Sequence, residues 1–254
     1  MGTLDGKKAI ITGGGTGIGF EIASKFLAEG ADVLIAGRTE KKLLDAREKL
    51  SSDRGRVLCC PADIAKEPDV KNMFRAALDG WGRVDILINN AGAMRMNKPL
   101  TDTTLEEWNS VIHTNINGTF MCSREAAGIM KKQKTGKIIN ISSMSGYIAN
   151  KYFHPGSYEV SKSALSMLTK VFALELAEYK IAVNAIAPGY YDTQPNRDFF
   201  SGNAELSSKV LDLIPRGKLG SIEELGHLAA YLSSDAVAYL TGQTIIIDGG
   251  YTIW

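Results

Sequence analysis

Short runs of Val, Ile and other apolar residues alternate with longer amphipathic stretches along the whole chain. Few polar residues interrupt these runs, which is typical of strands covered on both faces of a parallel sheet. Parallel strands need long crossovers, and the stretches between the runs have the length and period of helices. The sequence therefore predicts an α/β fold with a doubly wound, seven-stranded parallel sheet and helices on both faces. The expected strands are residues 7–12, 32–36, 56–61, 85–89, 136–142, 181–187 and 244–248.

This alternation continues without a Pro- or Ser-rich linker, a charge block or a repeat, so we expect residues 1–254 to form one domain. It is interrupted only in residues 190–215, which contain Gly, Pro, Asn and aromatic residues but no long apolar period. Loops after strand ends form the ligand crevice of open α/β sheets, so we expect this segment to act as a substrate lid. The expected helices are residues 17–29, 40–50, 67–81, 105–132, 157–179 and 221–233.

Charge and composition argue against several classes of protein. The chain has 29 basic and 28 acidic side chains and a net charge of +1, which gives no electrostatic footprint for nucleic acid or an acidic membrane surface. The N-terminal residues lack the apolar core of a signal peptide, and no run of about 18 apolar residues occurs, so we expect a cytoplasmic protein. The three cysteines and three histidines have no metal-ligand spacing, and we expect no metal site.

A glycine-rich turn follows the first expected strand and precedes a helical pattern. Glycines let the backbone turn tightly and approach a pyrophosphate, and the helix N-terminus offers free N–H groups and the positive end of its dipole. A flexible loop would also be rich in glycine, but this position between strand and helix favours a dinucleotide site. The candidate cofactor-binding residues in the turn are Gly13, Gly15, Thr16, Gly17, Ile18 and Gly19.

Further motifs follow in a fixed order along the chain. They are Asp63 after the third strand, Asn89-Asn90-Ala91-Gly92 after the fourth, Ser143 after the fifth, Tyr158-x-x-x-Lys162 on the next helix and Pro188-Gly189 after the sixth strand. With the turn Thr-Gly-x-x-x-Gly-Ile-Gly, this order resembles the single-domain short-chain dehydrogenase/reductases from about residue 4 to the C-terminus. The resemblance implies a Rossmann fold and hydride transfer between a nicotinamide cofactor and an alcohol or carbonyl carbon.

The resemblance also implies the cofactor contacts outside the turn. Asp63 would bind the adenine amino group, the backbone around Asn90 would border the adenosine ribose, and Thr193 would meet the nicotinamide carboxamide. The remaining cofactor-binding candidates are Ile64, Ala91, Gly92, Tyr158, Lys162, Pro188 and Gly189.

Tyr158 is the acid/base that the resemblance implies, with Lys162 one helical turn away. A free phenol has a pKa near 10, and we expect the neighbouring ammonium to lower the pKa of Tyr158. Lys162 would also hydrogen-bond the nicotinamide ribose, Ser143 would hold the substrate oxygen, and Asn115 would support a water relay behind Lys162. Ser143 lies two residues farther from Tyr158 than is usual in the family, so Ser145 stays open as the alternative to the preferred Ser143.

The end of the second strand bears on the choice of cofactor. An acidic residue at position 37 would bind the ribose hydroxyls of NAD and repel a 2′-phosphate, but this position is Gly37 and Arg38 follows it. A guanidinium can bind a phosphate bidentately, so NADP(H) is favoured over NAD(H). The opposing interpretation makes Arg38 only a solvated loop residue.

The substrate is the least determined part of the prediction. The segment after Ser143 resembles the polyol and sugar-acid dehydrogenases, and the C-terminal residues 248–254 resemble the galactitol dehydrogenases among them. This resemblance implies a small hydroxylated substrate. The alternatives are a 3-oxoacyl-[acyl-carrier-protein] reductase and, from another class, a non-catalytic cofactor-binding regulatory protein. The family resemblance also implies a homotetramer assembled through residues 105–132 and 157–179. The candidate substrate-facing residues are Ser145, Asn150, His154, Tyr190 and Asn196.

Overall fold

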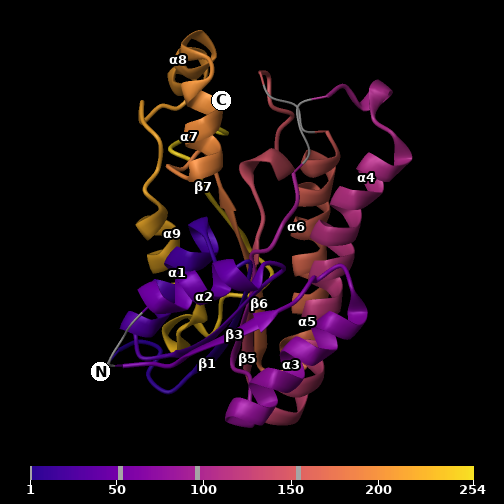
Figure 1. Ribbon diagram of the computed structural model, residues 1–254, viewed down its shortest axis with the longest axis vertical. Coiled ribbons are helices and arrows are strands. Elements are labelled where there is room, and N and C mark those ends of the chain that lie inside the picture. Colours follow the sequence, from indigo (N-terminus) through magenta and orange to yellow (C-terminus); the bar gives the residue numbers. More distant parts are fainter. Residues whose placement is uncertain (1, 51–53, 95–97, 153–155) are drawn as a thin grey trace.

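The computed structural model describes residues 2–50, 54–94, 98–152 and 156–254. In this part of the chain, seven parallel strands form one sheet in the order β3-β2-β1-β4-β5-β6-β7 (Figure 1). The predicted doubly wound sheet is confirmed, and the boundaries of each expected strand differ from the observed ones by a single residue. The strands are β1 (Lys8–Thr12), β2 (Asp32–Gly37), β3 (Val57–Pro61), β4 (Ile86–Asn89), β5 (Gly136–Ile141), β6 (Ile181–Pro188) and β7 (Thr244–Ile247).

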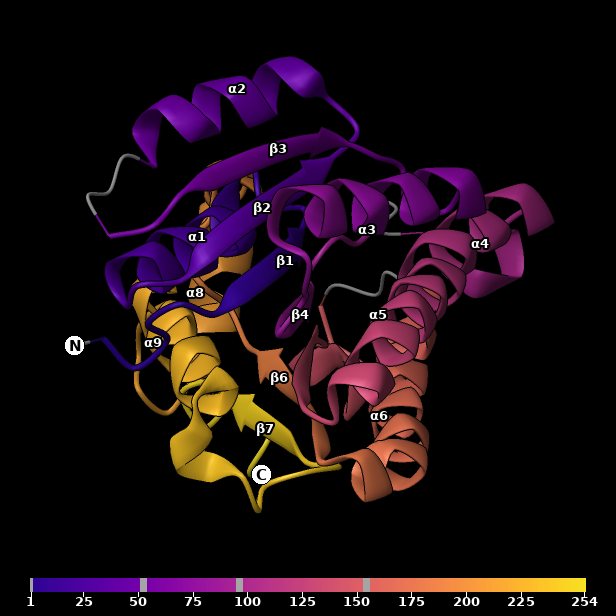
Figure 2. The same ribbon diagram turned by 90° about the horizontal axis from the view of Figure 1, so that it is seen from below.

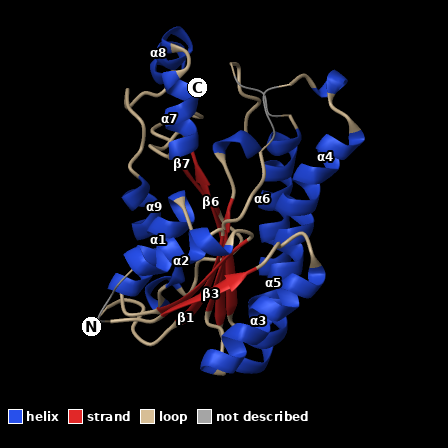
Figure 3. Cartoon of the chain, viewed as in Figure 1, coloured by secondary structure: helices blue, strands red, loops and turns tan. Residues whose placement is uncertain are grey.

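Helices cover the sheet on both faces. α1, α2 and α9 contribute buried residues to one hydrophobic cluster, and α3, α5 and α6 contribute to a second cluster on the opposite face (Figures 2 and 3). The helices are α1 (Gly17–Ala28), α2 (Glu40–Lys49), α3 (Glu67–Trp81), α4 (Leu105–Ile112), α5 (Thr119–Gln133), α6 (Ser157–Leu176), α7 (Gln194–Ser201), α8 (Ala204–Asp212) and α9 (Ile222–Ser233).

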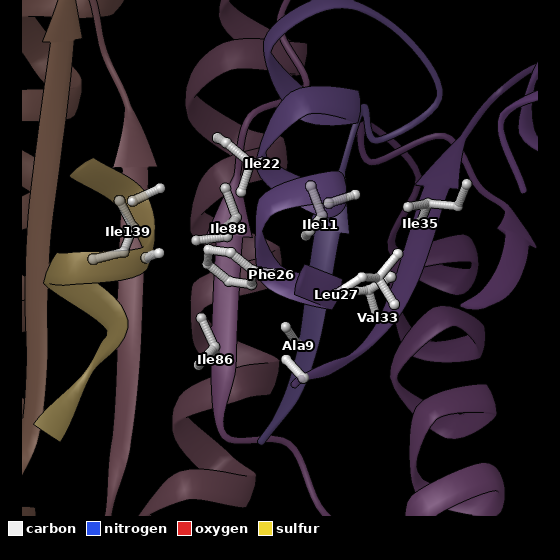
Figure 4. Packing of buried hydrophobic residues seen from close by; sticks show 14 of the residues in the cluster. Ala9, Ile11, Ile22, Phe26, Leu27, Val33, Ile35, Ile86, Ile88 and Ile139 are labelled. Atoms are coloured by element: carbon white, nitrogen blue, oxygen red, sulfur yellow. The ribbon is translucent and has the colours of Figure 1, made fainter. Parts of the chain in front are cut away.

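Neighbouring residues along β1 belong to different clusters, because successive side chains in a strand point to opposite faces. Ile11 lies in the cluster that includes Ile22 and Phe26 of α1 (Figure 4). Ile10 lies in the other cluster, with Met73 of α3. Both faces of the central strand are therefore buried, which explains why its sequence shows an uninterrupted apolar run.

The expected helix 105–132 is interrupted. α4 and α5 are joined by a π-helical turn, His113–Gly118, which contains Asn115. The amphipathic period did not reveal this turn, because Val111 before it and Cys122 after it are both buried. A π turn widens the helix locally and is frequent at functional sites.

Residues 190–215, where we expected no long helix, contain α7 and α8 beyond the carboxyl ends of β6 and β7 (Figure 1). Each has fewer than ten residues, too few for a clear apolar period. The side chain of Asn203 caps α8 by accepting a hydrogen bond from the backbone N–H of Leu206 at 2.9 Å.

Two further observations concern the described residues as a whole. None of the helices in these ranges combines the length and apolarity that a bilayer crossing requires. The same residues contain no group of three or more His, Cys, Asp or Glu side chains placed to hold a metal ion.

Candidate active site

The order in which strands are added to the sheet reverses between β1 and β4. Open α/β sheets bind their ligands at such a point, beyond the carboxyl ends of the strands. Thr12 at the end of β1 ties these two strands together. Its hydroxyl oxygen accepts hydrogen bonds from the backbone N–H groups of Asn90, at 3.0 Å, and Ala91, at 3.1 Å. The amide of Asn90 donates back to the carbonyl oxygens of Thr12, at 3.0 Å, and Gly13, at 3.2 Å. These four hydrogen bonds therefore join the glycine-rich turn to the Asn90 segment.

The glycines of this turn fit a pyrophosphate. Gly13 and Gly17 have φ angles of 66° and 55°, in the left-handed region that favours glycine. A Cβ on Gly19 would lie 2.3 Å from the carbonyl oxygen of Gly13, so only glycine lets α1 start this close to the strand. Thr16 makes no side-chain cap, and the first turn of α1 has no acidic residue, so its N–H groups are free for an anion.

The candidate adenosine contacts lie beyond the ends of β2 and β3. Arg38 is exposed and forms no hydrogen bond or ion pair with any described residue. One carboxylate oxygen of Asp63 accepts from the backbone N–H of Ala65 at 3.1 Å. Ile64 is buried, and its side chain lies 2.8 Å from where a Cβ on Gly118 would stand. Arg38 and Asp63 thus have side-chain atoms available to a ligand, and the Ile64 side chain packs against Gly118.

The other candidate cofactor residues follow β4 and β6. A Cβ on Gly92 would stand 3.5 Å from the Asn115 amide oxygen and 3.8 Å from the Lys162 ammonium, so Gly92 borders both groups. A Cβ on Gly189 would stand 2.6 Å from the Cα of Asp248, so glycine is required where Pro188-Gly189 leaves the sheet. Thr193 is half-buried at the start of α7, and its side chain makes no cap.

Tyr158 and Lys162 lie in the first turns of α6, and Ser143 follows β5. The Lys162 side chain is 4% exposed, and its ammonium lies 5.4 Å from the centre of the Tyr158 ring. The ammonium donates to the carbonyl oxygen of Ile141 at 2.7 Å. The Ser143 side chain lies close enough to the Tyr158 hydroxyl to lower the pKa of the phenol. The three residues are therefore brought together at the carboxyl end of β5.

The pKa of Tyr158 differs from the expectation. Burial raises it, and the hydrogen bond with Ser143 lowers it by a smaller amount. The expected lowering by Lys162 is absent because the ammonium is directed to the Ile141 carbonyl oxygen and not to the phenol. Burial also lowers the pKa of Lys162 to about 8, so both groups are shifted toward their neutral forms.

Asn115 is buried in the π turn and holds the segment after β4. Its amide oxygen accepts from the backbone N–H of Ala93 at 2.7 Å, and its amide nitrogen donates to the Ala93 carbonyl oxygen at 2.9 Å. The same nitrogen donates to the hydroxyl of Ser161 at 2.8 Å. Asn115 therefore links the Asn90 segment to the helix that carries Tyr158 and Lys162.

A second group of polar side chains lies next to Ser143. The backbone N–H of Ser145 donates to the Ser143 hydroxyl oxygen at 3.1 Å, and the Asn150 amide donates to the Ser145 hydroxyl oxygen at 3.0 Å. Both the backbone N–H and the amide of Asn150 donate to Glu159, each at 2.8 Å. Sequence reasoning missed Glu159, whose position beside Tyr158 was its only signal.

The remaining substrate candidates are placed less uniformly. The Tyr190 ring packs edge-on against Phe200, with centroids 5.8 Å apart, and against Tyr251, at 5.6 Å. The Asn196 amide donates to the carbonyl oxygen of Tyr191 at 2.7 Å and so closes its own loop. His154 lies outside the described residues. Tyr251 was not predicted as a site residue. It reaches Tyr190 through a turn at Asp248, and a turn has no hydrophobic period that a sequence could show.

Comparison with known proteins is consistent with this geometry. A family model described as enoyl-(acyl carrier protein) reductase matches residues 13–252. The crystal structure of a short-chain type dehydrogenase/reductase from Mycobacterium marinum is 36% identical, has a TM-score of 0.92, and is aligned over 98% of this chain and 96% of that one. The chain belongs to the short-chain dehydrogenase/reductase family.

Relatives in this family have different names. A 3beta-hydroxysteroid dehydrogenase of Eggerthella lenta is 37% identical over 255 residues, which cover 99% of this chain and 95% of the relative. A 3-oxoacyl-[acyl-carrier-protein] reductase of Synechocystis is 34% identical over 258 residues, which cover all of both chains. This short-chain dehydrogenase/reductase is therefore an oxidoreductase of the family that uses nicotinamide cofactors, and its relatives do not agree on a substrate.

Proposed function

We propose that this oxidoreductase interconverts a secondary alcohol and a ketone with NADP(H), and that Tyr158 is the acid/base. The observation that carries the proposal is the grouping of three side chains: Ser143 lies beside Tyr158 and lowers its pKa, and the buried Lys162 ammonium lies 5.4 Å from the tyrosine ring. The bound nicotinamide supplies the hydride in reduction and accepts it in oxidation.

Each side chain has a distinct role in this proposal. Tyr158 donates its phenol proton to the carbonyl oxygen during reduction and takes it back during oxidation. Ser143 holds that oxygen beside the phenol. Lys162 binds the nicotinamide ribose through its ammonium, which lies 5.4 Å from the centre of the Tyr158 ring. Asn115 fixes the backbone behind Lys162, where a chain of water molecules would return the proton.

The preference for NADP(H) rests on the end of β2. Gly37 offers no carboxylate to a ribose 2′-hydroxyl, and the Arg38 guanidinium is exposed without an ion pair to any described residue. A free guanidinium gains more from a dianionic 2′-phosphate than from a hydroxyl. Thr16, the neighbouring exposed position of the glycine turn, adds no positive charge, so Arg38 would provide the discrimination.

For the substrate we propose a polyol, a ketose or a sugar acid. The Ser145 hydroxyl accepts a hydrogen bond from Asn150, which leaves its proton available to a substrate hydroxyl. Asn150 and Tyr190 add further polar groups beside the reacting centre. In this proposal α7 and α8 form the lid that excludes water from the crevice.

One observation favours a second candidate function. Tyr190, Phe200 and Tyr251 form an aromatic wall, and Tyr251 lies in a hydrophobic cluster with Met144 and Ile214. Such a wall would suit the apolar body of a larger substrate, an acyl chain or a steroid ring system, as the names of two relatives indicate for those proteins.

A homotetramer and a cytoplasmic location also belong to the proposal. α6 exposes Val160, Met167, Val171 and Leu174 at spacings of three, four and seven residues, which align them in one apolar stripe, and α5 exposes Phe120. An exposed apolar stripe of this kind is typical of a helix that packs against another subunit.

The test measures NADPH and NADH oxidation with ketoses, keto-sugar acids, a β-ketoacyl thioester and a 3-oxosteroid. Fast turnover of a ketose or keto acid, lost by at least about 1,000-fold in Tyr158→Phe with unchanged NADPH affinity, would support the proposal. Turnover of only the thioester or the steroid would support the second candidate. NADPH binding without turnover of any carbonyl would indicate a regulatory protein.

A further inference from the structure

Glu159 lies directly after the proposed acid/base, yet no role in the reaction has been given to it. Its carboxylate oxygen Oε1 accepts two hydrogen bonds from one residue, from the backbone N–H and the amide Nδ2 of Asn150, each at 2.8 Å. Hydrogen bonds to a carboxylate are stronger than those between neutral groups. Glu159 therefore fixes both the backbone and the side chain of Asn150.

This fixation determines the orientation of the Asn150 amide. A carboxylate only accepts hydrogen bonds, so the nitrogen of the amide, and not its oxygen, must face Glu159. The second hydrogen of that nitrogen is donated to the Ser145 hydroxyl oxygen at 3.0 Å. Asn150 is 2% exposed, and its oxygen Oδ1 is buried without a hydrogen-bond partner among the residues that the structure describes. A buried acceptor without a partner is costly, and such groups occur where function requires them.

The chain of hydrogen bonds continues to the reacting centre. The Ser145 hydroxyl oxygen already accepts from Asn150, so its own proton must point elsewhere. The backbone N–H of Ser145 donates to the Ser143 hydroxyl oxygen at 3.1 Å and so holds this side chain next to the phenol of Tyr158, whose pKa it lowers. Four consecutive contacts thus connect the Glu159 carboxylate, through Asn150, Ser145 and Ser143, to the phenol of Tyr158.

We infer that Glu159 is a positioning residue, which acts through Asn150 and Ser145 to orient Ser143 and to present the Ser145 hydroxyl to a substrate hydroxyl beside the reacting carbonyl. The part of this inference that concerns substrate hydroxyls rests on the proposed function. The part that concerns Ser143 applies to any carbonyl that the enzyme reduces.

The test compares wild type with Glu159→Ala, Glu159→Gln and the control Glu175→Ala. Glu175 is exposed near the end of the same helix and makes no hydrogen bond or ion pair with a described residue. Glutamine keeps an oxygen that can accept from Asn150, whereas alanine removes it. The thermal unfolding midpoint and the NADPH dissociation constant of each variant establish that the fold and the cofactor site are intact.

Two measurements decide the inference. The first is kcat/KM for an α-hydroxyketone and for the matched ketone without the hydroxyl. In Glu159→Ala we expect a loss of about 10- to 100-fold for the hydroxyketone, a smaller loss carried by kcat for the plain ketone, and recovery to within about fivefold in Glu159→Gln. The second is hydrogen exchange of the Asn150 backbone amide, which should become faster in Glu159→Ala and stay protected in Glu175→Ala.

The outcomes separate this inference from the proposed function. Equal losses for both ketones, or a loss in Glu159→Gln as large as in Glu159→Ala, would overturn the specific role of the carboxylate oxygen. If wild type prefers the plain ketone, the hydroxylated-substrate proposal fails, while an unchanged kcat in Glu159→Ala would overturn the positioning of Ser143. If wild type reduces no carbonyl, the hydrogen-exchange result alone decides whether Glu159 holds Asn150.

Discussion

The connection between the glycine-rich turn after β1 and the Asn90 segment after β4 depends on one buried hydroxyl. Thr12 is fully buried. Its hydroxyl oxygen accepts from the backbone N–H groups of Asn90 and Ala91, and its O–H donates to the carbonyl oxygen of Ile88 at 3.3 Å. Thr12→Val keeps the shape of the side chain and removes all three hydrogen bonds. Both N–H groups belong to half-buried residues, so water can replace only part of what each loses.

The expected cost follows from these three groups. A buried polar group without a partner costs about 1–3 kcal/mol, and the lower half of that range applies to the two partly hydrated N–H groups, so Thr12→Val should lower the free energy of unfolding by about 2–4 kcal/mol. For a chain of this length that loss lowers the unfolding midpoint by roughly 5–15 °C. The cofactor should also bind more weakly, because the Asn90 segment is no longer fixed to the glycine turn.

The assay is urea denaturation at one protein concentration, with Thr12→Ser as the matched control. Serine keeps the hydroxyl and loses one buried methyl group, which costs about 1 kcal/mol. Thr12→Val should therefore be less stable than Thr12→Ser by at least about 1 kcal/mol. Equal stability of the two variants would refute the reasoning, because it would show that the hydroxyl contributes no more than the methyl group.

Three further predictions concern charge and surface. Lys162→Met should abolish turnover yet raise the free energy of unfolding at pH 7 by up to roughly 3 kcal/mol, because the buried lysine has a pKa of about 8 and the unfolded chain binds this proton more tightly. This gain should shrink as the pH rises from about 8 toward 10.5, and denaturation curves in which it grows would contradict the sign. Arg38→Asp should weaken NADPH binding at least about 10-fold and leave NADH binding unchanged or stronger; equal losses for both in a fluorescence titration would make Arg38 irrelevant to the choice. Leu174 is 82% exposed in the α6 stripe, so Leu174→Glu should reduce the assembly mass measured by light scattering, and an unchanged mass would remove α6 from the subunit contact.

The sequence predicted the sheet because the pattern that reveals each strand is also the cause of its burial. Ile10 and Ile11 are both buried because helices cover both faces of the sheet. The uninterrupted apolar run in the sequence is a direct consequence of this burial. The glycine turn was predictable for a similar reason, since the position of Gly19 admits no Cβ.

The parts that escaped prediction depend on contacts between distant residues. Glu159 reads as an ordinary helix surface residue until the loop after β5 brings Asn150 to its carboxylate. The pKa of Tyr158 could not be inferred from the Tyr-x-x-x-Lys spacing, because the direction of the ammonium is set by the Ile141 carbonyl oxygen. The helices of the segment 190–215 are too short for a period to reveal them.

The π turn at His113–Gly118 also limits how the length of this chain can change. A π turn holds about one residue more than an α-helical turn, so deleting one residue here would let the segment close into a regular α-helix with α4 and α5 still in register. Val111 would keep its place in the core, but Asn115 would lose the wide turn that directs its amide to Ala93, and with it two hydrogen bonds. A single-residue deletion in this turn should therefore preserve the fold and remove the link that Asn115 makes to the segment after β4.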